Sequence, residues 1–319
     1  MNLVFDMPGA HDARNVLKLA PLDVLLHVEC VQALPDAVAA ACQGWEGCAH
    51  GRSAPLRLRI KVSAERTGTG SVEIRADSTR IMVWGPGAVG RADVEQGFAG
   101  CTISTAYLDD PVALRQEVLE PLVLMLITRR DRTPFHASAF IVDGLAILLA
   151  GRTGAGKSCL AKAADTDGYQ VLSDDTVFVQ LAPDLTVWGW PTAAHLLAHD
   201  APDVSSPTRL RGGTVKHIVP LRSSSQNAIA CNETVLCLLS RSRTGYPSLE
   251  PISRTAAEER LWPLDEGFDL LPGPIAEAFA SLAADGAWDL RLSADPAEAV
   301  RLLVDSLPRL RNTASLPPQ

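Results

Sequence analysis

The spacing of apolar residues predicts a group of strands in the first third of the chain. In residues 55–63, PLRLRIKVS, apolar and basic side chains alternate, as expected for a strand with one solvated face. The apolar run from Leu22 to Cys30 predicts another strand, and the segments SVEIRA and TRIMVWG should pair as a hairpin around Asp77 and Ser78. The glycine-rich stretch 85–100 is expected to form a long loop.

The pattern then changes to the period of a helix. Asp110 and Pro111 are residue types favoured at the N-cap and the first turn. Pro121 should kink this helix, because proline has no backbone N–H to donate. The charged segment 129–134, RRDRTP, is the predicted domain boundary. The apolar residues that recur along one helix face are Val118, Leu119, Leu122, Val123, Leu126 and Ile127.

Short apolar runs predict a sheet in the rest of the chain. FHASAFIV and LAILLA are separated by Asp143 and Gly144, which is a strong hairpin signal. Apolar and β-branched residues indicate further strands. These predicted strands are YQVLS (169–173), TVFVQ (176–180), LTVWGW (185–190), TVLCLLS (234–240) and WDLRL (288–292).

The C-terminal part is expected to end in a capped helix. Asp295, Pro296 and Glu298 have the types and spacing of a capping box that opens an amphipathic helix. Residues 191–217, rich in Pro, His, Gly and Ser, are expected to be loop-like. The tail 313–319 is expected to be disordered.

Composition is that of an ordinary globular protein, with 319 residues, 47% hydrophobic and 21% charged. We expect two domains, a smaller α+β domain at residues 1–130 and an α/β domain at residues 131–312. The net charge of -8 offers no basic excess, so neither nucleic acid nor membrane is an expected partner. The sequence shows no long apolar run, no signal-peptide pattern and no C-x-x-C pair among its seven cysteines, which predicts a cytoplasmic protein with reduced thiols.

Residues 151–158, GRTGAGKS, match the complete G-x-x-x-x-G-K-[ST] pattern of a phosphate-binding loop. The apolar run before them and the helix-forming CLAKAA after them give the strand, turn and helix that this loop requires. Backbone N–H groups of the turn and the helix N-terminus would surround phosphate oxygens. ATP or another nucleoside triphosphate, with Mg²⁺, is therefore the expected cofactor. The predicted cofactor site consists of Gly151, Arg152, Thr153, Gly154, Ala155, Gly156, Lys157, Ser158 and Cys159.

Phosphoryl transfer also needs side chains with defined roles. Lys157 would contact the β- and γ-phosphates, and the Ser158 hydroxyl would bind Mg²⁺. A further metal ligand and, for a hydroxyl acceptor, a base are supplied by Asp174 and Asp175 at the end of a predicted strand. Two adjacent aspartates are often a solvated turn, but their place after the loop helix favours function. Because neighbouring side chains of an extended strand face opposite ways, either the chain bends here or the two aspartates divide the roles.

The segment from Phe135 to Val179 resembles the catalytic domain of the HPr kinase/phosphorylase family and of the wider group of HPr-kinase-like proteins. The matching features are His136 one hairpin before the loop, the GKS of the loop, and GYQVLSDD after it. VKHIVP, TVLCLLS and WDLRL are similar to distant members more loosely. Residues 1–130 do not resemble the N-terminal domain of that family, and WPTAAHLLAHD replaces the Glu-Ile-Arg-Gly-like stretch of the bacterial HPr kinases.

The resemblance implies a phosphoenolpyruvate-carboxykinase-like P-loop kinase core with a mixed sheet, and ATP- and Mg²⁺-dependent phosphorylation of a serine hydroxyl. It implies Asp174 as general base, Asp175 near Mg²⁺ with Ser158, and His136 beside Asp174, although the sequence does not order the two aspartates. Since lasso-peptide-precursor kinases belong to the wider group, a peptide or protein hydroxyl is the expected acceptor. Two other functions are compatible with the sequence: a small-molecule kinase, and a nucleotide-gated binding module with slow hydrolysis. The sequence is also compatible with a homo-oligomer.

Weaker candidates lie in the stretch expected to be loop-like. Arg211 and Lys216 flank two glycines and would contact a phosphate if this loop closed on the nucleotide, whereas a solvated basic loop is the alternative. His195 and His199 are four residues apart and would share a helix face suited to Zn²⁺, without a glutamate to act as hydrolytic base. The N-terminal domain is expected to present the acceptor.

Overall fold

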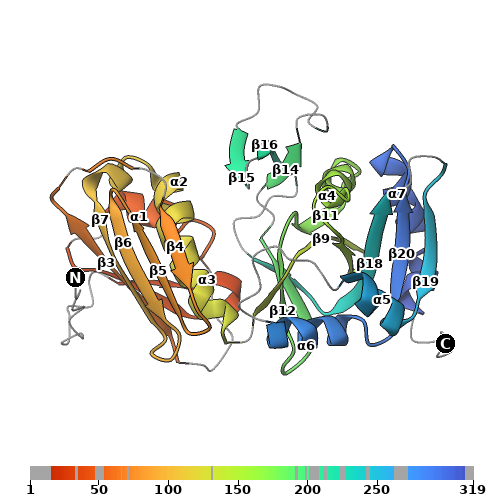
Figure 1. The fold of residues 1–319 in the computed structure, drawn as a ribbon, viewed down its shortest axis with the longest axis horizontal. Coiled ribbons are helices and arrows are strands. Elements are labelled where there is room, and N and C mark those ends of the chain that lie inside the picture. The colour runs from red at the N-terminus through yellow and green to blue at the C-terminus, as the bar shows by residue number, and fades with distance from the viewer. Residues whose placement is uncertain are drawn as a thin grey trace. The chain divides into compact units, whose positions relative to one another are not determined.

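The computed structural model divides the chain into two compact units, Met1–Arg132 (unit 1) and Thr133–Gln319 (unit 2) (Figure 1). No helix in the part of the chain that the structure describes is long and apolar enough to cross a membrane. The described residues are 16–32, 35–46, 54–65, 67–69, 72–130, 132–190, 193–197, 200, 208–211, 214–222, 228–241, 245–261 and 272–312.

Unit 1 contains a seven-stranded mixed sheet. Its strands are β1 (Val16–Leu19), β2 (Leu26–Cys30), β3 (Leu56–Ser63), β4 (Glu73–Ala76), β5 (Arg80–Gly85), β6 (Ala88–Asp93) and β7 (Phe98–Ser104). The strand order is β1-β2-β3-β7-β6-β5-β4, in which β2, β3 and β7 are parallel neighbours and the other pairs are antiparallel. The predicted strand at 55–63 and the predicted hairpin around Asp77 are thus confirmed.

Helical segments of unit 1 pack on one face of this sheet. They are η2 (Pro21–Asp23), α1 (Asp36–Ala41), η3 (Thr105–Leu108), α2 (Pro111–Ala113), the π-helical η4 (Leu114–Leu119) and α3 (Glu120–Thr128). Asp110 caps α2 as predicted, since its carboxylate accepts the backbone N–H of Ala113 at 3.0 Å. Pro121 lies in the first turn of α3, directly after the π-helical segment, so its missing N–H falls where the hydrogen-bond pattern changes.

Two predictions for unit 1 were wrong. The stretch 85–100 is not a long loop but contains β6 and the start of β7. Its glycines serve packing: a Cβ on Gly90 would lie 2.9 Å from Cδ1 of Leu122 in α3, so glycine lets the helix approach the sheet. The strand predicted from Leu22 begins only at Leu26, because Leu22 lies in η2 with a φ of 52°.

Unit 2 is organised around a six-stranded mixed sheet. Its strands are β9 (Ala137–Val142), β10 (Leu145–Ala150), β11 (Gln170–Ser173), β18 (Glu233–Arg241), β19 (Ser248–Ile252) and β20 (Ala287–Leu292). The order is β11-β9-β10-β18-β20-β19, with β10, β18 and β20 parallel. The hairpin of β9 and β10 is confirmed, and its two turn residues, Asp143 and Gly144, have φ angles of 49° and 84°.

Two smaller antiparallel sheets complete unit 2. One has the order β17-β13-β12-β8, and its strands are β8 (Thr133–Phe135), β12 (Val177–Gln180), β13 (Thr186–Gly189) and β17 (Ile229–Cys231). The other has the order β14-β16-β15, and its strands are β14 (Ala193–Leu197), β15 (Thr208–Arg211) and β16 (Thr214–Pro220). The prediction of a loop over 191–217 was therefore wrong. β14 pairs with β16 across about twenty residues or more, whereas β15 and β16 form a local hairpin, and a composition rich in Pro, His and Gly concealed both pairings.

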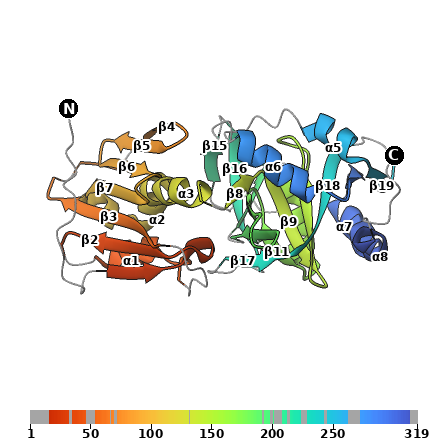
Figure 2. The ribbon, with the colours of Figure 1, turned by 90° about the horizontal axis from the view of Figure 1, so that it is seen from below.

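Helices and the smaller sheets cover both faces of the six-stranded sheet. The helices are α4 (Lys157–Thr166), α5 (Arg254–Leu261), α6 (Pro272–Leu282), α7 (Pro296–Asp305) and α8 (Leu307–Arg311). Alternate residues of β10 lie in two cores: Ile147 packs in the core that contains Leu160 of α4, and Leu148 in the core that contains Leu282 of α6. Figure 2 shows the helices α5, α6, α7 and α8 of unit 2 around its strands. This double burial explains why β10 is continuously apolar.

Helix α7 has the predicted N-cap at Asp295 but not the predicted capping box with Glu298. The Asp295 carboxylate accepts the backbone N–H of Ala297 at 2.9 Å, which confirms the N-cap. Glu298 does not close a capping box but accepts the hydroxyl of Ser293 at 2.9 Å. The tail 313–319 lies outside the described residues.

Candidate active site

Strand directions bring the predicted site residues to one edge of the six-stranded sheet. The phosphate loop follows the carboxyl end of β10, and β9 begins directly opposite, with Ala137 paired to Ala150. His136, the residue before β9, therefore lies at this edge. β11 is antiparallel to β9 and ends at the same edge, where Asp174 and Asp175 follow it. Segments from 136 to 175 thus meet because of the hairpin and the next strand, not because of sequence proximity.

The phosphate loop has the strand, turn and helix context that was predicted. Residues 152–156 form turns and bends between β10 and α4. Gly156 precedes α4 with a φ of 110°, and a Cβ there would lie 2.9 Å from Cδ1 of Leu292. Only glycine suits both requirements, because a side chain would be strained by the angle and would collide with β20.

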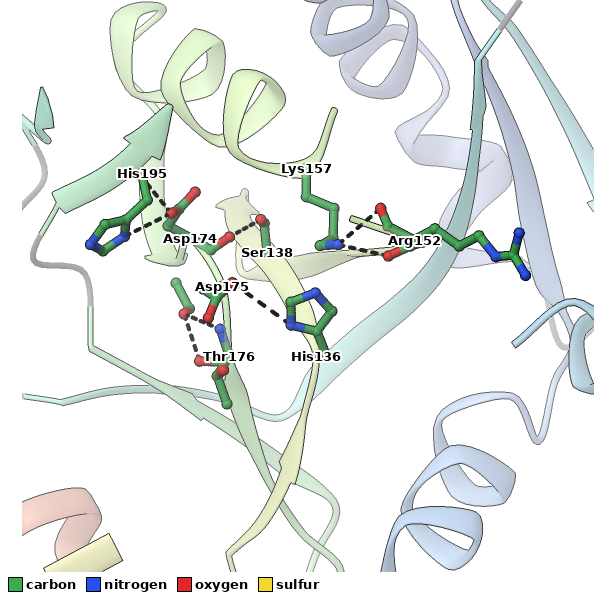
Figure 3. A network of polar contacts seen from close by, with 10 residues as sticks. His136, Ser138, Arg152, Lys157, Asp174, Asp175, Thr176 and His195 are labelled. Carbon is green, nitrogen blue, oxygen red and sulfur yellow. Dashed lines mark hydrogen bonds and ion pairs between the residues drawn. The ribbon is translucent and has the colours of Figure 1, made fainter. Parts of the chain in front are cut away.

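Lys157 lies over its own loop. Its ammonium group donates to the backbone oxygen of Gly151 at 2.6 Å and to that of Arg152 at 3.3 Å (Figure 3). The side chain is buried. Loop carbonyls therefore hold the cation at the position where the β- and γ-phosphates are expected, and binding of a triphosphate would exchange these bonds for bonds to phosphate oxygens.

The chain bends at the aspartate pair. The pairing of β11 with β9 is irregular between Val171 and Ser173, and β11 ends at Ser173. The hydroxyl of Ser173 donates to the backbone oxygen of Thr176 at 2.6 Å, and Ser138 of β9 donates to the backbone oxygen of Asp174. These bonds fix the bend from both sides. Figure 3 shows the result: Asp174 points to His195 and Asp175 points to His136.

Asp174 is buried against β14. Its Oδ2 accepts the backbone N–H of His195 at 2.9 Å and lies 3.4 Å from the ring Nδ1 of the same residue. Its Oδ1 is buried and has no hydrogen-bond partner within the described part of the chain. A buried carboxylate oxygen that is left unsatisfied is costly, so this atom is suited to receive a proton or a cation during function.

Asp175 faces a cavity together with the phosphate loop. The carboxylate lies 3.8 Å from Nδ1 of His136, and its side chain is 24% exposed, whereas that of His136 is 8% exposed. The cavity has a volume of about 530 Å³ and is also lined by Lys157 and Ser158. The two aspartates therefore take different positions at the bend: Asp175 lines the cavity, and Asp174 is buried against β14.

Arg241 is a candidate that sequence reasoning missed. It is the last residue of β18, the parallel neighbour of β10, and its guanidinium lies about 4 Å from the position of a Cβ on Gly156. It lines the same cavity, as do His195, Leu196, Leu197 and Asp200. Only the parallel pairing of two strands far apart in sequence reveals it. The available signal was a basic residue directly after an apolar strand, which is common on surfaces.

The thiol of Cys159 is not suited to act as a nucleophile. Burial, with the nearby Asp200 carboxylate, raises the pKa of the Cys159 thiol to about 12. The group is therefore protonated at neutral pH and is a poor nucleophile. Its N–H lies in the first turn of α4, where helix N–H groups bind phosphate.

The structure describes only some of the weaker candidate residues. Lys216 of β16 lines the cavity, whereas the side chain of Arg211 lies outside the described residues. The zinc hypothesis for His195 and His199 was wrong in its premise, because His195 lies on strand β14 and not on a helix. His199 lies outside the described residues. Within the described part of the chain, no three His, Cys, Asp or Glu side chains cluster to hold a metal ion.

The oxygen donors of the site nevertheless suit Mg²⁺. Mg²⁺ is commonly held by one or two carboxylates, with water and substrate phosphates as its other ligands, so a cluster of three side chains is not required. Asp175 and Ser158 line one cavity with Lys157. Asp174, the residue before Asp175, has a further carboxylate oxygen, Oδ1, which has no hydrogen-bond partner among the described residues. These residues fit a magnesium nucleotide better than a zinc ion, which prefers nitrogen and sulfur.

A second cavity, of about 400 Å³, adjoins the first. It is lined by residues of α4, by the segment between β20 and α7, and by Leu196. Gly156, Cys159, Asp200 and Arg241 line both cavities. The two cavities therefore share part of their lining around the first turn of α4, and each has a volume in the range of small-ligand pockets.

Comparison with known proteins adds little to this geometry. No known family and no curated protein matches the chain. Among solved structures, the HPr(Ser) kinase/phosphatase from Coxiella burnetii is similar at 13% sequence identity, with 56% of this chain and 97% of that chain covered and a TM-score of 0.30. A similarity of this size does not establish a shared activity, so the function has to be inferred from the site.

Proposed function

We propose that this chain is a phosphotransferase that moves the γ-phosphoryl group of ATP, with Mg²⁺, to a hydroxyl group, and that the acceptor is a serine of a peptide or protein. The observation that carries the proposal is the meeting of a complete phosphate loop with two carboxylates and a histidine at one sheet edge. A loop alone would support nucleotide binding only. Transfer to a hydroxyl needs the acidic groups as well. The serine acceptor is supported by the sequence resemblance of residues 135–179 to HPr-kinase-like proteins.

In this proposal the triphosphate lies along the loop. Backbone N–H groups of the turn and the first turn of α4 bind phosphate oxygens, and Lys157 leaves the carbonyls of Gly151 and Arg152 to contact the β- and γ-phosphates. Arg241 lies where its charge would also stabilise the phosphates. The nucleoside would occupy the second cavity, because it begins at Gly156 and Cys159, beyond the loop.

The two aspartates would divide the remaining work. Asp175 shares its cavity with Ser158, which supports a joint role in holding Mg²⁺; the ion, when bound, would neutralise charge on the transferring group. Asp174 would accept the proton of the acceptor hydroxyl through Oδ1, while His195 fixes its other oxygen. His136, next to Asp175, would orient that carboxylate. Because the Asp174 carboxylate is buried, the acceptor hydroxyl could reach it only if β14 moved away.

The decisive experiment incubates the protein with γ-³²P-labelled ATP, Mg²⁺ and a library of serine-containing peptides, and measures labelled peptide. We expect Asp174→Asn to lower transfer by about 10²-fold or more with little change in the Mg²⁺ concentration at half-maximal rate. Asp175→Asn should instead raise that Mg²⁺ concentration. Both variants should retain nucleotide binding, because neither residue belongs to the phosphate loop.

The same experiment separates the alternatives. If wild-type protein binds ATP but labels no peptide, and Asp174→Asn leaves slow hydrolysis unchanged, the chain is a nucleotide-gated binding module. This alternative is favoured by one observation, the bonds that hold Asp174 to His195 and away from the cavity. Labelling of small alcohols in place of peptides would point to a small-molecule kinase.

A further inference from the structure

One face of the unit 1 sheet carries a regular array of charges. Strand pairing brings Arg59 of β3 opposite Gly100 of β7, Gly100 opposite Arg91 of β6, Arg91 opposite Met82 of β5, and Met82 opposite Arg75 of β4. Because cross-strand partners share a face, these residues form one row, and positions two residues away on each strand share that face. We call this face the outer face.

The outer face is the one on which no helix of the described part of unit 1 is seen to pack. Residues of the opposite parity on the central strands are fully buried, for example Leu58, Ile60 and Val83. A Cβ on Gly90 would touch Leu122 of α3, which puts the helices on that opposite side. On the outer face, Met82 is 48% exposed and the Arg80 side chain 58% exposed. The outer face is therefore solvated.

Basic residues dominate the outer face, although the whole chain has a net charge of -8. The cations of this face on strands β3 to β6 are Arg57, Arg59, Lys61, Arg75, Arg80 and Arg91. The carboxylates in the same rows are Glu29, Glu73 and Asp93. The excess of positive charge on one face of an acidic protein marks a place where an acidic partner would be attracted.

Contacts on the outer face hold several of these cations in place. Arg59 pairs with Glu29 at 3.3 Å, and Arg80 pairs with Asp93 at 3.2 Å. The guanidinium of Arg75 lies 4.9 Å from the ring centroid of Trp84. In the same way Arg57 lies 5.9 Å from the centroid of Phe98. Cations held by a ring or an ion pair lose less freedom when a ligand binds, so the array is preorganised.

The chemistry of the outer face fits a polypeptide better than a nucleic acid. Apolar side chains such as Met82 and Val89 lie between the cations, and a peptide can place its own apolar side chains against them. The carboxylates Glu29 and Glu73 would repel a backbone that is charged at every unit, and so would the net charge of the chain. The span from β3 to β4 is about 19 Å, the length of about six extended residues.

We infer that the outer face of unit 1 is a docking surface for an extended acidic segment of a polypeptide. Carboxylates of that segment would pair with Arg91, Lys61 and Arg59, and its apolar residues would contact Met82. That the segment belongs to the polypeptide carrying the acceptor serine rests on the proposed function. The docking itself does not, because it involves neither the nucleotide nor the residues of the phosphate loop.

The test is a binding measurement on the full chain without nucleotide. The probe is a fluorescein-labelled peptide of alternating glutamate and alanine, about twelve residues long, followed by fluorescence anisotropy. We expect binding that weakens as salt is added, and a loss of affinity of about tenfold or more in a chain with both Arg59→Glu and Arg91→Glu. The matched control carries Arg254→Glu and Arg301→Glu in unit 2. It has the same net charge and should bind within about twofold of wild type.

Three outcomes overturn the inference. The first is absence of binding by the wild-type chain at low salt. The second is equal loss of affinity in the outer-face variant and in the control, which would show only a net-charge effect. The third is tighter binding of a labelled oligothymidylate of similar length, lost in the same outer-face variant, which would make the face a nucleic-acid site. If Arg59→Glu with Arg91→Glu does not melt cooperatively, Lys61→Glu with Arg75→Glu replaces it, since both side chains are exposed.

Discussion

The candidate chemistry of unit 2 lies at an edge of its sheet, whereas the charge array of unit 1 lies on a face of its sheet. In unit 2 the six-stranded sheet is covered on both faces, and its candidate chemistry lies at one edge, where strands end. In unit 1 the seven-stranded sheet is covered on one face, and its charges lie on the other. A sheet buried on both faces has only its strand ends left for ligands, whereas a half-covered sheet can present a whole face.

The burial patterns of single strands show this difference between the two sheets. All six residues of β10, LAILLA, are buried, as in a strand packed on both sides. In β3, LRLRIKVS, Leu56, Leu58 and Ile60 are buried and the basic residues between them are not. The first pattern yields a rigid core that positions the phosphate loop, and the second yields a surface suited to recognition. The predictions below test whether chemistry and recognition are in fact separated in this way.

Loss of the loop lysine should give the largest effect. We expect Lys157→Ala to lower phosphoryl transfer by about 10³-fold, because charge on the transferring group would lose its main side-chain partner. Radiolabel transfer measures this, and anisotropy should show unchanged binding of the acidic peptide to unit 1. Arg254→Ala is the control, since Arg254 is an exposed cation of α5 in the same unit; its transfer rate should stay within about threefold of wild type. A loss of peptide docking in Lys157→Ala would contradict the separation.

A substitution in the unit 1 sheet beneath α3 should have the second largest effect. Gly90→Ala would place a Cβ 2.9 Å from Leu122 and 3.1 Å from Cys101, so we expect a loss of about 2 kcal/mol in the free energy of unfolding of unit 1. Urea denaturation followed by unit 1 tryptophan fluorescence measures this, while nucleotide binding by unit 2 should persist. In Gly68→Ala the added Cβ meets no atom within 4 Å, and stability should change by less than about 0.5 kcal/mol. Equal effects of the two changes would disprove the packing argument.

The smallest effect concerns an ion-pair network around Asp289 of β20. Asp289 of β20 accepts from Arg260 at 2.8 Å and from Arg291 at 3.1 Å. Burial alone would raise the pKa of this carboxyl, but the two guanidinium groups outweigh it and the net shift lowers the pKa. The carboxylate therefore stabilises unit 2 above the unfolded-state pKa of about 4, and this contribution disappears as pH falls through the lower folded-state pKa.

Asp289→Asn should remove that contribution. We expect a loss of about 1 kcal/mol at neutral pH, because both arginine side chains are partly exposed, and a flatter dependence of stability on pH below about 4. Urea denaturation of unit 2 at a series of pH values measures both. Glu250→Gln serves as control, since Glu250 is an exposed partner of Arg291 at 3.6 Å. An unchanged pH profile in Asp289→Asn would show that the network contributes nothing.

Local signals were sufficient for some elements and insufficient for others. The hairpin at Asp143 and Gly144 and the strand–loop–helix at 145–166 followed from turn chemistry and apolar runs, and the structure has both. The sequence failed at 85–100 and 191–217, where glycine and proline suggested loops. In the first stretch β7 pairs with the distant β3 and Gly90 allows α3 to pack closely, and in the second β14 pairs with β16 about twenty residues or more away.

For the site, the sequence named the groups but not their positions. It pointed to the loop and the aspartate pair through patterns within short segments, and to His136 only through a sequence resemblance. It did not find Arg241, whose only relation to the loop is the parallel pairing of β18 with β10. Nor did it foresee that Asp174 would be held by the backbone of His195.

By itself, the sequence determined the phosphate loop and the strands and helix around it, because these depend on local turn geometry and on spacing within a few residues. Only the tertiary structure decided which carboxylate faces the cavity, which distant cation joins it, and that the cations of unit 1 line up on one solvated face. Those features arise from strand register and sheet covering. Both are set by packing between segments far apart in the chain, and no local pattern records them.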